Sequence, residues 1–168
     1  MTQREHTIKW LMYSLVFLPV LICDVMLLNR FPILGVTPML MPLAVVAVAT
    51  LEGSVAGAGF GLAVGLVCDA LYGSSGSFTL LLPVCGAASG MATRYGLRQN
   101  VLGCFVCSLV TLVVIDLWRV SFRMFWGFDA QALLQVASLE ILYSLPFALL
   151  VFPLNNWVHR RLGGSKYF

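Results

Sequence analysis

Residues 51–73 read LEGSVAGAGFGLAVGLVCDALYG, and this stretch decides the fold. Glycine recurs in it at every fourth position, at Gly53, Gly57, Gly61 and Gly65. In an α-helix, residues four apart lie on nearly the same face. A helix face without side chains lets another backbone approach closely, which is how helices associate inside a membrane. We therefore predict a membrane helix over 54–72 whose glycine face packs against a neighbour, either within this chain or in a partner.

The composition is that of a membrane protein. Of the 168 residues, 60% are hydrophobic and only 10% are charged, whereas a soluble domain has about 25% charged residues. The net charge of +3 is too small to indicate binding to nucleic acid. We expect residues 1–168 to form a single integral membrane domain surrounded by lipid.

Apolar runs separated by turn residues predict an all-α polytopic membrane protein with six transmembrane helices in one bundle. The predicted helices cover about 8–28, 37–51, 54–72, 78–93, 101–118 and 132–154. Pro38 suits the first turn of the second helix. That helix is short, however, so a single re-entrant element over 37–72, with five crossings in total, is the alternative.

The helix predicted over 78–93 carries a small face of its own, with Gly86 and Gly90. A short loop joins it to the helix over 54–72, so we expect the two to be adjacent and antiparallel. The glycine face is then either the contact between these two helices, which we favour, or a docking face for a partner helix.

Six crossings would place both termini on the same side of the membrane. That side would hold seven basic residues, Arg4, Lys9, Arg94, Arg98, Arg160, Arg161 and Lys166. The opposite side would hold three, Arg30, Arg119 and Arg123. Basic residues are more frequent on the cytoplasmic side, so we predict that both termini are cytoplasmic.

Five of the seven acidic residues lie within or at the ends of apolar runs, namely Asp24, Glu52, Asp69, Asp116 and Glu140. Ionisable groups at membrane depth usually face the bundle interior and pair with one another. We predict an ion pair between Arg119 and either Asp69 or Asp116. Glu140 lies deepest, and we expect it to be protonated or hydrogen-bonded across helices.

An enzymatic function finds little support in the sequence. Asp69 and Asp116 could form the carboxylate pair of an intramembrane aspartyl peptidase, but their flanks CDALYG and VIDLWR lack polar residues to orient a substrate. Cys104 and Cys107 form a C-x-x-C inside an apolar run, where cysteine packs as a small apolar residue. We predict no enzyme activity, and we expect no catalytic residue, cofactor or metal site.

Several residues resemble the motif of the rod shape-determining MreD family. They are Thr37-Pro38, Gly59, Gly61, Gly65, Asp69, Gly73-Ser74 and the acidic Asp116 of LVVID. The resemblance implies a non-enzymatic subunit of the bacterial elongation machinery in the cytoplasmic membrane. Its implied partners are the bitopic protein MreC, cytoplasmic MreB filaments and the peptidoglycan synthases. It also implies a fold similar to the substrate-binding subunits of energy-coupling-factor transporters.

A vitamin-binding transporter subunit of that type is the rival function. Such subunits usually present an alanine-x-x-x-alanine face on the first helix, and residues 8–28 contain no alanine. They also need a polar pocket near the outer face of the membrane. The candidates for that pocket here are Asp69, Asp116, Trp118 and Arg119.

Overall fold

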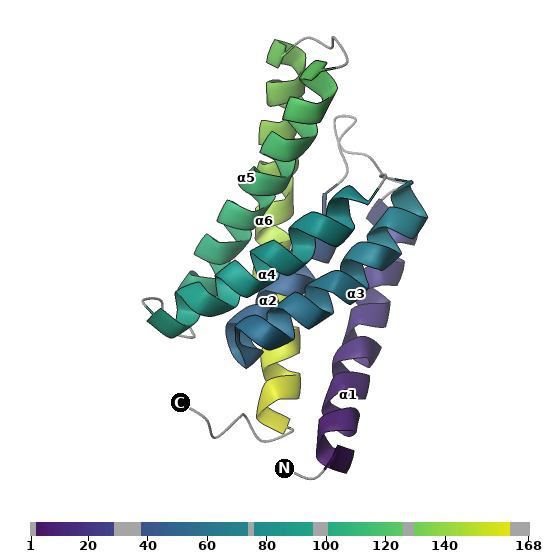
Figure 1. The fold of residues 1–168 in the computed structure, drawn as a ribbon, viewed down its shortest axis with the longest axis vertical. Helices are drawn as coiled ribbons and strands as arrows, with labels where there is room; N and C mark the ends of the chain where they lie inside the picture. Colours follow the sequence, from purple (N-terminus) through teal and green to yellow (C-terminus); the bar gives the residue numbers. More distant parts are fainter. Residues whose placement is uncertain (1–2, 29–37, 74–75, 96–100, 126–129, 162–168) are drawn as a thin grey trace.

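A computed structural model describes residues 3–28, 38–73, 76–95, 101–125 and 130–161 (Figure 1). Within these ranges the chain forms six α-helices and one π-helical turn, and no β-strand. The elements in chain order are α1 (Gln3–Ile22), η1 (Cys23–Leu28), α2 (Met41–Glu52), α3 (Ser54–Tyr72), α4 (Ser77–Tyr95), α5 (Val101–Phe125) and α6 (Ala130–Arg161). The predicted all-α class is confirmed.

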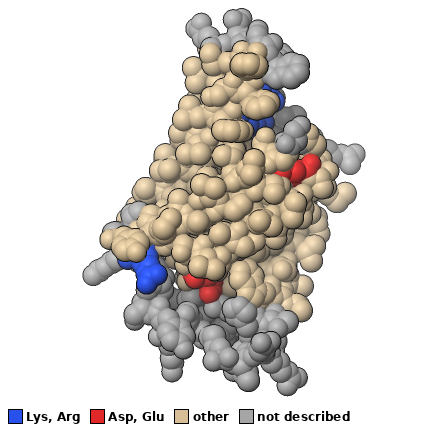
Figure 2. All heavy atoms as spheres, viewed as in Figure 1, with Lys and Arg blue, Asp and Glu red and all other residues tan. Residues whose placement is uncertain are grey.

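In the part of the chain that the structure describes, three helical segments are long and apolar enough to cross a membrane, namely Ser54–Tyr72, Val101–Phe125 and Leu133–Asn156. Large apolar side chains such as Leu11, Val55 and Leu102 are exposed on the outside of the bundle. On the face shown in Figure 2, a broad apolar band separates charged side chains above it from those below it. These features indicate a membrane protein. The predicted count of six crossings stays a prediction, because α2 with its 12 residues extends only about 18 Å, against a hydrocarbon core of about 30 Å.

Helix α2 forms the centre of the bundle. Every residue from Met41 to Leu51 is buried, as expected for a helix that is hydrophobic on all sides. Leu43, Val46 and Ala47 belong to a core cluster shared with α5 and α6. Met41, Val45 and Val48 belong to a second cluster shared with α1, α3 and α4. All the other helices are thus packed around one short apolar helix.

Helix α2 begins later than predicted, at Met41 rather than Thr37. Thr37 lies outside the described residues, and residues 38–40 are not helical. The backbone N–H groups of residues 39 and 40, which have no acceptor within the helix, instead donate to side chains from distant parts of the chain. Met39 N donates to Ser144 Oγ (2.9 Å), and Leu40 N donates to Asp24 Oδ1 (3.2 Å). The proline in the first turn is consequently Pro42, not Pro38.

Different helix ends form the two ends of the bundle (Figure 1). The start of α1 and the end of α6 lie at the same end of the molecule, the lower one in Figure 1. At the opposite end, α5 and α6 extend beyond α3 and α4. Helix α3 ends and α4 begins near this upper end, on either side of the loop that follows Gly73. The charged cavity described below lies near this end.

Candidate functional site

Helices α3 and α4 pack against each other along one antiparallel line of glycines. A Cβ atom added to Gly61 would lie 2.6 Å from the Leu82 carbonyl oxygen, and one added to Gly65 would lie 2.7 Å from the Phe78 carbonyl oxygen. Each step of four residues forward on α3 thus corresponds to four residues back on α4. The backbones therefore touch where side chains are absent. We call these contacts the glycine seam.

The seam continues to the start of α3. A Cβ on Gly57 would meet both Gly86 O (2.7 Å) and Ala49 Cβ (2.5 Å), so α2, α3 and α4 all meet there. A Cβ on Gly90 would meet the backbone of Gly53 and Ser54. Gly53 itself has open space around its Cβ position and a φ of +93°, and it ends α2 so that α3 can fold back. The glycine face of α3 is thus covered by α4 and is not presented to an outside partner.

Asp69 caps α4 from the preceding helix. Its carboxylate accepts hydrogen bonds from Phe78 N (3.2 Å), Thr79 N (2.8 Å) and Thr79 Oγ1 (2.5 Å). The first backbone N–H groups of a helix have no partner within the helix, and a carboxylate there is further favoured by the helix dipole. Asp69 therefore fixes the start of α4 at the end of the glycine seam. Of the two pairings predicted for Arg119, the structure shows the one with Asp116, at 3.6 Å.

We expect Asp69→Asn to be milder than Asp69→Leu. Asparagine retains one acceptor oxygen and should destabilise the protein by about 1 kcal/mol. Leucine leaves the α4 N–H groups without an acceptor and should destabilise it by about 2–3 kcal/mol. The measurement is the thermal unfolding midpoint of each purified variant in detergent. Thr79→Val, which removes only the hydroxyl bond, is the control and should have the smallest effect. Equal losses for Asn and Leu would contradict a hydrogen-bonding role.

Arg119 on α5 holds two buried carboxylates. Its Nη1 atom lies 2.9 Å from Glu140 Oε1 on α6 and 3.6 Å from Asp116 Oδ1 on its own helix. Asp116 and Glu140 are 4% and 7% exposed, so their charges need a partner inside the protein. Glu140 thus takes part in a contact across helices, and Asp116 is the aspartate that lies beside Arg119. Together the three residues tie α5 to α6.

Asp116 and Asp69 have separate partners. Asp116 Oδ2 is buried and has no hydrogen-bond partner among the residues described, while Asp69 caps α4. The described contacts therefore lend no support to the shared-proton pair that an aspartyl peptidase requires.

A third buried carboxylate, Asp24, connects η1 to the start of α2 and the end of α3. It lies in η1, and both of its oxygens accept hydrogen bonds, one from Leu40 N and one from the Tyr72 hydroxyl. Pro19 precedes η1, and a π-helical turn near a proline is a common place for a helix to bend. The sequence indicated Asp24 as an acidic residue near a helix end, but it gave no sign of these partners.

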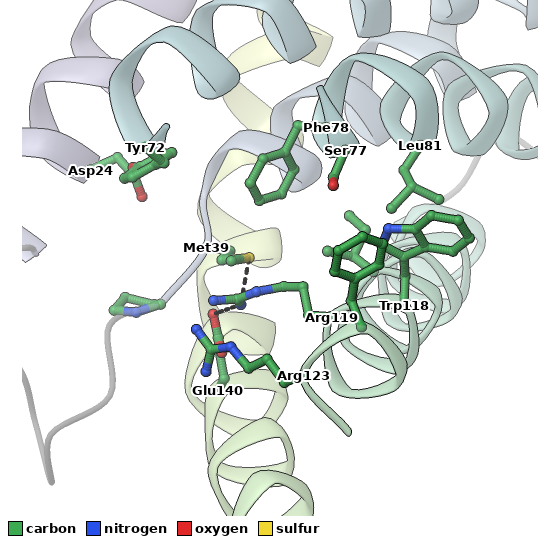
Figure 3. Close-up of a pocket in the computed structure, with 13 residues that line it drawn as sticks. Asp24, Met39, Tyr72, Ser77, Phe78, Leu81, Trp118, Arg119, Arg123 and Glu140 are labelled. Carbon is green, nitrogen blue, oxygen red and sulfur yellow. Dashed lines mark hydrogen bonds and ion pairs between the residues drawn. The ribbon is translucent and has the colours of Figure 1, made fainter. Parts of the chain in front are cut away.

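Asp24, Arg119 and Glu140 border a cavity of about 490 Å³ at the upper end of the bundle (Figure 3). Its walls come from η1, residues 38–39, the end of α3, the start of α4, the second half of α5 and the first third of α6. The lining residues are Asp24, Pro38, Met39, Tyr72, Ser77, Phe78, Leu81, Ile115, Trp118, Arg119, Phe122, Arg123 and Glu140. Figure 3 shows Arg119 and Arg123 reaching from α5 toward Glu140, with Phe78 and Ser77 of α4 nearby.

The cavity contains only part of the predicted polar set. Of the four residues predicted for a polar pocket, Trp118 and Arg119 line it, whereas Asp69 and Asp116 are not among its described lining residues. Glu140, which was not predicted for the pocket, also lines it. Sequence reasoning did not select Ser77 or Tyr72 for it. Arg123 could have been selected from its spacing of four residues from Arg119, because that spacing places both side chains on one helix face.

Comparison of the sequence with protein families, with curated proteins and with solved structures finds no match.

Proposed function

We propose that this chain is a non-enzymatic scaffold subunit of the bacterial cell-elongation complex, placed in the cytoplasmic membrane with both termini in the cytoplasm. In this function it binds an MreC-like bitopic protein and links MreB filaments to the peptidoglycan synthases. The proposal begins from the resemblance carried by residues 37–74 and Asp116.

The observation that best supports the proposal is that the motif residues hold two helices together. Gly61 and Gly65 bring the backbones of α3 and α4 into contact, and Asp69 caps α4. All three residues build a tightly joined helix pair, and none of them lines the cavity. A motif whose residues serve to assemble helices is what a scaffold subunit requires, because its function is to present a fixed surface rather than to carry out a reaction.

The cavity favours the rival function, a substrate-binding subunit of a vitamin transporter. Its volume of about 490 Å³ falls within the range of small-molecule sites. However, its acidic groups are already occupied within the chain. Glu140 binds Arg119, and Asp24 accepts bonds from Tyr72 and Leu40. We rank this function second, and stabilisation of the purified protein by a water-soluble vitamin would favour it over the scaffold.

Co-purification tests the scaffold function. We expect the full chain, tagged and co-expressed with the MreC-like protein of the same genome, to retain that protein through solubilisation and size exclusion. An unrelated bitopic protein with an apolar helix of the same length is the control, and it should be lost. Equal retention of both proteins, or of neither, would count against the proposal.

A further inference from the structure

A second, apolar cavity adjoins the charged one. It measures about 470 Å³ and is lined by Trp118, Ser121, Phe122 and Phe125 of α5. Trp118 and Phe122 line both cavities. The two spaces are therefore neighbours along one side of α5, with charged groups in one and almost only apolar groups in the other.

Arg123 lies at this junction and has no partner in the part of the chain that the structure describes. Its side chain is exposed, lines the charged cavity, and forms no hydrogen bond or ion pair with any residue in the described part of the chain. Arg119 shares its Nη1 between Glu140, Asp116 and Met39 Sδ, and a third of its side chain is exposed. The acidic lining groups Glu140 and Asp24 are bonded within the protein. Because these acidic groups already have partners and Arg123 has none among the described residues, the charged cavity is suited to bind an anion.

The apolar cavity faces the surroundings of the bundle rather than its core. Phe122 is 59% exposed and Phe125 is 92% exposed, on a helix that is apolar enough to cross a membrane. Trp118, which also lines this cavity, is of a residue type that is enriched where membrane helices meet the lipid headgroups. Apolar chains of lipid are therefore the material available to fill this space.

We propose that the two adjoining cavities bind one anionic phospholipid. The phosphate lies in the charged cavity, where Arg123 and the exposed edge of Arg119 donate hydrogen bonds to it. The first part of an acyl chain lies in the apolar cavity against Trp118, Phe122 and Phe125. This inference does not depend on the scaffold function. It rests on the joined polar and apolar spaces and on the guanidinium at their junction, which has no partner among the described residues.

A lipid fits these observations better than a soluble anion does. A free phosphate or a small carboxylate would satisfy Arg123 but would leave the apolar cavity unoccupied. A zwitterionic lipid would bring a quaternary ammonium group toward two arginines, which is unfavourable. The arrangement therefore selects both for negative charge and for an attached apolar chain.

Native mass spectrometry of the full chain in detergent tests this proposal. The probes are dioleoyl phosphatidylglycerol, dioleoyl phosphatidylcholine and sn-glycerol 3-phosphate, each titrated to give a dissociation constant. For the unmodified chain we expect phosphatidylglycerol to bind about tenfold more tightly than phosphatidylcholine, and glycerol phosphate to bind more weakly than either lipid. Arg123→Gln should bring the two lipids to within about twofold of each other.

Arg94→Gln is the matched control, because Arg94 is exposed on α4 and does not line either cavity. This variant should retain the full preference for phosphatidylglycerol. Phe125→Ala, at a position too exposed to affect folding, should weaken phosphatidylglycerol and leave glycerol phosphate unchanged. It keeps the proposal testable if Arg123→Gln is not obtained folded. Equal binding of the two lipids by the unmodified chain, a preference that survives Arg123→Gln, or glycerol phosphate binding as tightly as the lipid would each overturn the proposal.

Discussion

A leucine at Gly61 should abolish the folded protein, whereas a leucine at Gly59 should leave it intact. The two glycines are two residues apart on α3, so both substitutions add the same apolar side chain to the same helix. A Cβ at Gly61 would lie 2.6 Å from Leu82 O, 2.8 Å from Leu82 C and 2.9 Å from Pro83 N. A Cβ at Gly59 meets no atom within 4 Å.

The difference between the two positions arises because the three atoms nearest to a Cβ at Gly61 all belong to the backbone. A flexible side chain could turn away from an added methyl group, but a helix backbone can only move as a whole. Forcing one added methyl group into a well-packed region destabilises a protein by about 1–3 kcal/mol. A leucine would separate α3 from α4 along much of the seam, so we expect the loss to exceed about 3 kcal/mol. Since α4 also contacts α2 at Gly86, the disturbance would reach the central helix.

The measurement is the yield of monodisperse protein by size exclusion in detergent, followed by thermal unfolding of the material that remains. Gly59→Leu should match the unmodified chain in both. Gly61→Ala provides a graded intermediate, with an expected fall in unfolding midpoint of about 5–10 °C. Normal yield and midpoint for Gly61→Leu would show that the backbones do not touch as described, and the seam would then have to be abandoned.

The sequence predicted those parts of the fold that depend on local periodicity. The helix expected over 54–72 coincides with α3, Ser54–Tyr72, because glycines bound the segment on both sides. The same period of four indicated which face of α3 would meet another helix. The start of α2 was misplaced because the prediction relied on Pro38 as a first-turn proline, whereas the acceptors for the N–H groups of residues 39 and 40 lie far away in the chain, at Ser144 and Asp24.

The candidate site was only partly predictable for the same reason. Acidic residues in apolar runs stand out in a sequence, so Asp116 and Glu140 could be named and a pairing of Asp116 with Arg119 could be anticipated. The partner of Glu140 depends on how α5 and α6 are placed side by side, which no local pattern encodes. The cavity needs contributions from η1, α3, α4, α5 and α6 at once, so its shape follows only from the assembled bundle.

Arg119→Met should destabilise the protein more than Glu140→Gln does. Arg119 is shared by two buried carboxylates, Glu140 at 2.9 Å and Asp116 at 3.6 Å. Glu140→Gln removes one carboxylate and leaves Arg119 beside Asp116. Arg119→Met removes the cation that contacts both buried carboxylates, and Asp116 Oδ2 has no hydrogen-bond partner in the described residues even in the unmodified chain.

Removal of one partner from a buried ion pair destabilises a protein by about 3–5 kcal/mol. Since a third of the Arg119 side chain is exposed, we expect the lower end, about 3 kcal/mol, for Arg119→Met. This corresponds to a fall of about 10 °C in the unfolding midpoint of a domain of this size. Glu140→Gln should lose about half as much, because an amide oxygen can still accept the bond from Arg119.

A triple variant with Arg119→Met, Asp116→Asn and Glu140→Gln separates charge from packing. Without the two carboxylates there is no unpaired charge to bury, so this variant should recover most of the midpoint lost by Arg119→Met alone. Arg123→Gln, measured in detergent without added lipid, is the control on the same helix face. It should leave the midpoint unchanged, because Arg123 has no partner in the described part of the chain. If the triple variant were less stable than Arg119→Met, packing around the arginine, and not the pairing of its charge, would hold α5 against α6.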